Sequence, residues 1–179
     1  KLLTPEWTPY LPLKEKTIGE ILRPAGYATG HFGKWHLNRT KKYEPGRPGD
    51  PRSQGFDDAV GTHKPGKGPT SPYENDWHHT HHITKRSLAF IERNKDKPFF
   101  CMLSFNAIHR PEKETQELIE KYRNKPGADN DEKYGHNNPK QAAMLETIDK
   151  SIGKVLARLD ELNLSENTLV IFFSDNGHL

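Results

Sequence analysis

The chain has 179 residues, a formal net charge of +3 at pH 7 and an apolar content of 32%. This length suits one domain or part of a larger one. Lysine and arginine are interspersed with acidic residues, so the chain has no basic stripe of the kind found in nucleic-acid-binding proteins. No apolar run approaches the roughly 20 residues that a membrane-spanning helix needs. An anionic substrate is compatible with this composition but is not demanded by it.

The N-terminal part of the chain predicts a short helix followed by a strand. Thr17 can cap the helix, because Glu20 stands three residues later in the spacing of a capping box. Pro24 and Gly26 are expected to end this helix. Residues 27–35 then predict a short strand that leads into a loop.

The middle of the chain is rich in glycine and proline. Residues 39–82 predict a long irregular excursion, and loops of this length are usually functional. A helix is expected over residues 83–94. The continuous apolar run at residues 99–105 predicts a strand that is buried on both faces.

The last third of the chain predicts two helices and one more strand. A polar helix is expected at residues 112–123. Residues 140–162 give the clearest helix, because their aliphatic residues recur at spacings of three and four and form one apolar stripe. Residues 167–174 are another continuous apolar run and predict a second buried strand. Helices that alternate with such strands indicate an α/β fold with a covered sheet.

Polar residues follow each of the three predicted strands. The segments are Gly33-Lys-Trp-His36, Asn106-Ala-Ile-His-Arg-Pro111 and Ser174-Asp-Asn-Gly177. In open α/β sheets, ligands bind at the carboxyl ends of the strands. These segments are therefore candidates for one functional site.

Lys34, His36 and His109 are the candidate catalytic residues. Lys34 and His36 stand two residues apart, and in an extended segment their side chains project to the same side. An ammonium beside an imidazole suits the binding of an anionic oxygen and the transfer of a proton. The alternative is that Lys34 and His36 are ordinary surface residues and His109 is a loop histidine without a function.

Asp175 and Asn176 admit two interpretations. Followed by glycine, they favour a tight turn, which is the better interpretation of this segment on its own. Their oxygens can also bind a hard divalent cation such as calcium or magnesium. Zinc is less suited, because it prefers His and Cys ligands.

Two other features are interpreted as structural. The run Trp77-His-His-Thr-His-His82 is typical of a metal-binding tract, but it has no cysteine and merges into a predicted helix. We interpret it as a solvated loop and helix entry. Cys101 lies in an apolar run and is interpreted as a buried strand residue.

Taken together, these motifs resemble those of a known family. The segment Gly26-Tyr-Ala-Thr-Gly-His-Phe-Gly-Lys-Trp-His-Leu37 closely resembles the second signature of the type I sulfatases, which are arylsulfatase-like enzymes. Further family motifs follow in order: Gln54-Gly-Phe-Asp57, Lys97-Pro-Phe-Phe100, His109-Arg-Pro111 and Ser174-Asp-Asn-Gly177. The resemblance implies the α/β fold of the alkaline-phosphatase-like superfamily, a mixed sheet covered by helices on both faces. Residues 1–179 are expected to form part of a single catalytic domain that is truncated at both ends.

The resemblance also implies roles for individual residues. Lys34 resembles the lysine that contacts the sulfate group, and His36 resembles the histidine beside the catalytic formylglycine. His109 resembles a second sulfate-contacting histidine, which protonates the leaving alcohol. Asp175 and Asn176 resemble two ligands of a single calcium ion. The implied reaction is the hydrolysis of sulfuric esters, with a sulfated small molecule or glycan as the substrate.

The family's nucleophile motif, Cys/Ser-x-Pro-x-Arg, does not occur in the sequence. Its Cys or Ser is converted to formylglycine and is expected upstream, so the chain alone is expected to be inactive. Asn38 replaces the glycine that usually follows this family's Gly-Lys-Trp-His-Leu run. Two alternatives stay open: a phosphodiesterase or phosphonate hydrolase of the same superfamily, and a decayed homologue that binds anions or carbohydrates. The resemblance further implies a periplasmic, secreted or lysosomal location.

Overall fold

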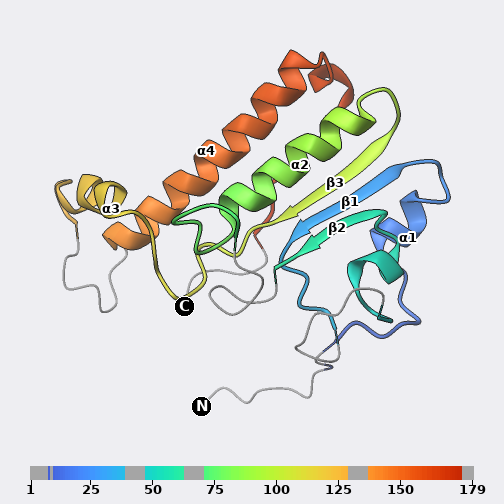
Figure 1. Ribbon diagram of the computed structural model, residues 1–179, viewed down its shortest axis with the longest axis horizontal. Coiled ribbons are helices and arrows are strands. Elements are labelled where there is room, and N and C mark those ends of the chain that lie inside the picture. Colours follow the sequence, from blue (N-terminus) through green and yellow to red (C-terminus); the bar gives the residue numbers. More distant parts are fainter. Residues whose placement is uncertain (1–7, 9, 39–46, 63–70, 129–136, 175–179) are drawn as a thin grey trace.

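Figure 1 shows the computed structural model of the chain, which describes residues 8, 10–38, 47–62, 71–128 and 137–174. At its centre is a parallel three-stranded sheet in the order β2-β1-β3. The strands are β1 (Ala28–Gly33), β2 (Asp58–Gly61) and β3 (Phe99–Ser104). In this register Gly33 lies opposite both Gly61 and Ser104, so the three strands end at one common edge.

Two long helices are layered on one face of the sheet (Figure 1). α2 (Thr80–Asn94) packs against β1 and β3, and α4 (Pro139–Glu161) packs on α2. The shorter α3 (Gln116–Arg123) packs against α4. None of the described helices combines the length and apolar character needed to cross a membrane.

The opposite side of the sheet carries smaller elements. α1 (Ile18–Leu22) and the 3-10 helix η1 (Pro51–Gln54) lie there, beside β1 and β2 (Figure 1). A second 3-10 helix, η2 (Ser165–Asn167), follows α4. The predicted α/β fold with helices on both sides of a sheet is therefore present, and the described strands are all parallel.

The main core lies between the sheet and α2. Phe32 on β1 packs with Ile83 and Phe90 on α2, and all three side chains are at most 2% exposed. The rings of Phe32 and Phe90 have centroids 5.6 Å apart. Burying an apolar side chain of this size stabilises a fold by about 1.5–3 kcal/mol. This contact fixes α2 across the middle of the sheet.

Most of the predicted elements are confirmed, with shifted ends. The capping box is present: Thr17 Oγ1 accepts from the Glu20 N–H at 3.2 Å, and the Glu20 carboxylate accepts from the Thr17 N–H at 2.9 Å. The strands predicted at residues 27–35 and 99–105 are β1 and β3. The helices predicted at residues 83–94, 112–123 and 140–162 are α2, α3 and α4, although α2 begins at Thr80 and α3 begins at Gln116.

The irregular excursion predicted for residues 39–82 is wrong in part. Its described portion contains η1 and β2, and β2 pairs with β1 in parallel register. β2 begins with Asp58 and ends with Gly61, so only Ala59 and Val60 carry an apolar pattern. Two residues are too few to show the apolar–polar alternation that is typical of a strand. The strand exists because β1 offers a hydrogen-bonding partner.

The strand predicted at residues 167–174 is also wrong. Residues 168–174 form no strand, and the side chains of residues 169–173 are 53–85% exposed. A strand needs a neighbour to pair with its N–H and C=O groups, and residues 168–174 pair with none of the described strands. β3 is likewise only half-buried, because it lies at an edge of the described sheet, and Met102 on it is 40% exposed.

Gly33 is a position at which the fold requires glycine. Its φ is +118°, and a Cβ there would lie 2.0 Å from the carbonyl oxygen of Ser104. We therefore expect Gly33→Ala in the complete protein to cost more than about 3 kcal/mol, since a steric clash adds to backbone strain. The measurement is the melting temperature and the soluble yield. Gly26→Ala is the matched control, because Gly26 also has a positive φ (+90°) but no atom within 4 Å of its Cβ position. Equal losses in the two variants would contradict a steric role for Gly33.

Candidate functional site

Hydrogen bonds tie the carboxyl ends of the three strands together. The carbonyl of Gly33 accepts from the Thr62 N–H at 3.0 Å, and the carbonyl of Ser104 accepts from the Lys34 N–H at 2.8 Å. The side-chain amide of Asn106 donates to Thr62 Oγ1 at 2.6 Å. Lys34, Thr62 and Asn106 therefore form a connected edge, at the place where the sequence predicted the site.

Trp35 anchors the segment that carries Lys34 and His36. Its indole N–H donates to the carbonyl of Gly49 at 2.7 Å, and its ring contacts the ring of His31 with centroids 5.0 Å apart. Lys34 is half-buried beside this anchor, whereas His36 is exposed. A half-buried aromatic side chain thus holds two polar neighbours at the edge of the sheet.

His36 does not have the extended backbone that the sequence prediction assumed. Its φ is +51°, in the left-handed region that residues with a side chain seldom adopt. The alternation that places Lys34 and His36 on the same side of a strand therefore does not apply at His36. A backbone of this kind costs on the order of 1–3 kcal/mol and is frequent at functional sites.

His109 lies in the loop that follows β3. Its backbone N–H donates to the carbonyl of Asn106 at 2.9 Å, and its side chain is exposed. The ring Nδ1 lies 2.7 Å from the carbonyl oxygen of Arg110. Because a carbonyl can only accept, Nδ1 carries a hydrogen, and Nε2 is the ring nitrogen left free of this contact to exchange a proton.

The three candidate catalytic residues share one edge but come from two loops. Lys34 and His36 follow β1, and His109 follows β3. Asp175 and Asn176 lie outside the described residues, so their predicted role as metal ligands stays a prediction. Within the described ranges, no group of three or more His, Cys, Asp or Glu residues is arranged to hold a metal ion.

The histidine run before α2 is less solvated than predicted. His78 and His79 are only 4% and 3% exposed, whereas His81 is exposed. His79 is the N-cap residue of α2, so the predicted helix entry is confirmed. Burial lowers the pKa of both His78 and His79, which favours neutral rings at pH 7.

Asp76 holds the beginning of α2 in place. Its carboxylate accepts from the backbone N–H groups of His81 and His82, both at 3.0 Å, and from the hydroxyl of Ser71 at 2.6 Å. A carboxylate at this position satisfies free backbone donors and stabilises a helix by about 0.5–2 kcal/mol. These N–H groups are therefore already occupied and do not offer an open anion site. The sequence analysis missed Asp76, although an Asp shortly before an amphipathic run is a known helix-start signal.

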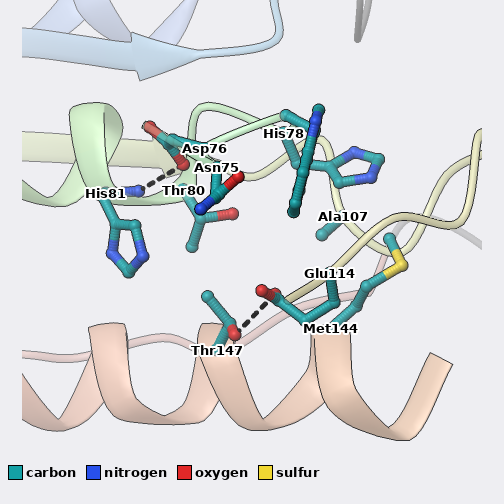
Figure 2. A pocket seen from close by; sticks show the side chains of 10 residues that line it. Asn75, Asp76, His78, Thr80, His81, Ala107, Glu114, Met144 and Thr147 are labelled. Carbon is teal, nitrogen blue, oxygen red and sulfur yellow. Dashed lines mark hydrogen bonds between the residues drawn. The ribbon is translucent and has the colours of Figure 1, made fainter. Parts of the chain in front are cut away.

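A small pocket opens between the start of α2, the loop after β3 and α4 (Figure 2). Asp76 lines it from the side of α2. Glu114 and Thr147 line the opposite side and are joined by a hydrogen bond of 2.7 Å. Ala107 also lines the pocket, two residues before His109. The pocket is thus adjacent to the loop that carries His109.

Cys101 has no nucleophilic role in the chain. Burial raises the pKa of its thiol to about 12. The reactive form of cysteine is the thiolate, so this side chain is inert at neutral pH. Its predicted position on a strand is confirmed, although on β3 the residue is half-buried rather than fully buried.

His31 lies behind the segment that carries Lys34. It is fully buried on the sheet face opposite to α2, where its ring contacts those of Trp35 and Phe56. Its Nε2 is 3.3 Å from the hydroxyl oxygen of Ser104. Burial lowers the pKa of His31 to about 4, although hydrogen bonds to backbone groups oppose this shift in part. The ring is therefore neutral at pH 7 and adds no charge to the site.

Comparison with known proteins gives a family match over almost the whole chain. Residues 2–179 match the family model described as "Sulfatase". The chain is 32% identical to an arylsulfatase of Hemicentrotus pulcherrimus and 28% identical to N-acetylgalactosamine-6-sulfatase of Canis lupus familiaris, each over 93% of its length. It is 30% identical to an ulvan-active sulfatase of Formosa agariphila over 95% of its length. These matches cover 32%, 34% and 37% of the three relatives, so the chain spans about a third of their length.

A solved structure supports the same fold. The putative sulfatase yidJ from Bacteroides fragilis superimposes on 88% of this chain with a TM-score of 0.65 and 21% identity, and the match covers 43% of that protein. The shared part therefore comprises most of the chain. The predicted alkaline-phosphatase-like fold is therefore confirmed.

We expect His31 to make the complete protein sensitive to acid. The ordinary pKa of 6.5 applies in the unfolded chain, so between pH 6.5 and 4 the unfolded state binds a proton that the folded state does not. The free energy of unfolding therefore falls as the pH drops through this window, by up to roughly 3 kcal/mol, and is unaffected above it. His31→Gln should show a smaller decrease in melting temperature between pH 7 and pH 4.5 than the wild type. Equal decreases would mean that His31 titrates normally.

Proposed function

Because the chain belongs to the sulfatase family, we propose that the complete protein hydrolyses sulfate esters and releases inorganic sulfate. The observation that carries this proposal is the family match over residues 2–179. The position of Lys34, His36 and His109 at the carboxyl edge of the sheet supports it, since this is where ligands bind in α/β folds.

The proposed substrate is a sulfated small molecule or glycan. The names of two relatives refer to saccharides, one to N-acetylgalactosamine and one to ulvan, which supports a glycan. The family resemblance is the basis for proposing where the complete protein is located. A periplasmic, secreted or lysosomal location is therefore part of the proposal.

Each candidate residue has a distinct proposed task. The Lys34 ammonium binds the sulfuryl oxygens, and its half-buried position strengthens this attraction relative to water. His109, as the imidazolium, delivers the proton on Nε2 to the oxygen of the leaving alcohol and becomes the neutral ring whose Nδ1–H is directed to the carbonyl of Arg110. His36 takes up a proton as sulfate is released.

Calcium and formylglycine are the groups that we propose to complete the site. The carboxylate of Asp175 and the amide oxygen of Asn176 are ligands of the kind that calcium prefers. They supply two of the roughly six to eight oxygens that calcium binds. The remaining ligands and the formylglycine are assigned to other parts of the complete protein. When bound, calcium neutralises negative charge at the sulfate and formylglycine supplies the nucleophilic oxygen.

The reaction class is tested with the complete protein, produced together with a formylglycine-generating system. We expect it to hydrolyse nitrophenyl sulfate in preference to nitrophenyl phosphate and phosphonate, and to lose activity with a calcium chelator. Readdition of calcium should restore the activity. A preference for phosphate or phosphonate would instead assign the protein to the phosphodiesterase and phosphonate hydrolase branch. Absence of turnover with all three esters and with sulfated saccharides would indicate a decayed homologue.

The proposed tasks of the three residues are tested by single substitutions. Lys34→Ala, His36→Ala and His109→Ala should each lower kcat/KM for nitrophenyl sulfate by about 10²–10⁴-fold, the range typical of lost charge stabilisation or proton transfer. Lys154→Ala is the matched control, because Lys154 is exposed on α4 and should leave kcat/KM unchanged. A variant with wild-type kcat/KM would remove that residue from the mechanism.

A further inference from the structure

Asn106 joins three segments of the site. It is 2% exposed, and its side-chain Nδ2 donates to Thr62 Oγ1 at 2.6 Å and to the carbonyl of His78 at 3.2 Å. Its own carbonyl accepts from the N–H of His109 at 2.9 Å. One buried residue thus connects the end of β2, the segment before α2 and the turn that carries His109.

The amide nitrogen is the part of Asn106 that makes these connections. An amide NH₂ has two hydrogens, and the two acceptors, Thr62 Oγ1 and the carbonyl of His78, use both of them. The carbonyl of His78 cannot donate, so an oxygen in the same place would face it without a hydrogen. Replacing the amide by a carboxylate therefore breaks the link to His78 while keeping the shape of the side chain.

Stability alone gives no reason for an asparagine at this position. The Oδ1 of Asn106 is buried and has no hydrogen-bond partner among the described residues. Burying an unsatisfied oxygen costs about 1–3 kcal/mol, which offsets the gain from hydrogen bonds of about 0.5–1.5 kcal/mol each. The net effect of Asn106 on the free energy of folding is therefore small. Its main effect is geometric, because it fixes the turn from Asn106 to His109 to the end of β2 and to the segment before α2.

His78 is the neighbour that transmits this restraint. Its side chain is 4% exposed, so it cannot swing into solvent. Burial is the largest influence on the pKa of His78 and lowers it; a backbone hydrogen bond at Pro111 and the charge of Asp76 oppose this shift, and nearby His79 and His109 add to it to a smaller extent. The ring of His78 is therefore neutral and immobile near the loop of His109. The side-chain amide of Asn106 holds the backbone of His78 in place.

We propose that Asn106 is a positioning residue of the sulfatase reaction, which holds the turn of His109 so that its Nε2 faces the leaving oxygen of the ester. This inference rests on the proposed function. Asn106 acts through His109 and does not touch the substrate. A displacement of about 1 Å at a catalytic group can lower a rate by roughly 10²-fold. A residue that only stabilised the fold would not have this effect on the rate of the folded enzyme.

The first experiment compares Asn106→Ala and Asn106→Asp with Asn94→Ala in the complete protein. Asn94 is a matched control, since it is also buried and its Nδ2 donates to a backbone carbonyl, that of Phe90, at 2.7 Å. It lies at the other end of α2, roughly 20 Å away along the helix. We expect both Asn106 variants to lower kcat for nitrophenyl sulfate by about 10–100-fold with little change in KM, while Asn94→Ala keeps the wild-type kcat. A wild-type kcat in the Asn106 variants, or the same loss in Asn94→Ala, would overturn the inference.

The second experiment asks whether Asn106 acts through His109. Asn106→Ala is combined with His109→Ala, and the double variant is compared with His109→Ala alone. If Asn106 positions His109, its removal should lower the residual kcat by less than about threefold, because nothing is left to position. The same 10–100-fold loss in both backgrounds would overturn the inference.

A third variant keeps the inference testable if the Asn106 variants do not fold. Thr62→Val removes one of the two acceptors and leaves Asn106 in place. It should lower kcat by a few-fold in the wild-type background and have no effect in the His109→Ala background. The wild-type complete protein, produced with the formylglycine-generating system, separates the proposed function from this inference. If it does not hydrolyse sulfate esters, both the proposed function and this inference fail; if it does, a full rate in Thr62→Val overturns the inference alone.

Discussion

The contact between Gly33 and Ser104 determines where the candidate site lies. At this point β1 approaches β3 so closely that a Cβ at Gly33 would meet the Ser104 carbonyl, and the next N–H, that of Lys34, donates to the same carbonyl at 2.8 Å. This hydrogen bond brings the loop after β1 beside the loop after β3. Lys34 and His109 are distant in the sequence, and they share one edge of the sheet because these two strands end together.

Local patterns predicted the helices well and the strands less well. The apolar stripe of α4 and the capping box at Thr17 are properties of neighbouring residues, so the sequence alone reveals them. β2 and residues 168–174 show the opposite case. β2 has almost no apolar pattern but pairs with β1, whereas residues 168–174 have a strong apolar pattern but no partner among the described strands. A strand depends on a neighbour, and its sequence cannot state whether that neighbour is present.

The same distinction applies to the site. Lys34, His36 and His109 are candidates from the sequence alone, because they follow predicted strands and lie in motifs with a family resemblance. Asn106 was visible in one of these motifs, but its role depends on hydrogen bonds to Thr62 and to His78, which only the fold brings together. The left-handed backbone of His36 and the burial of the histidine run before α2 are equally tertiary properties. Residue type and position therefore indicate which groups are candidates for the chemistry, and the fold determines how those groups are held.

Burial divides the histidines around this edge into two classes. His31, His78 and His79 are buried, and desolvation lowers their pKa values, so their rings are neutral and pack like other uncharged side chains. His36 and His109 are exposed at the same edge. A group that exchanges protons with a substrate must reach it and must also reach water to be reset. His36 and His109 meet the condition of exposure, while the buried rings of His31, His78 and His79 add no charge at this edge. This division supports proton transfer by His36 and His109, with Lys34 binding the anion.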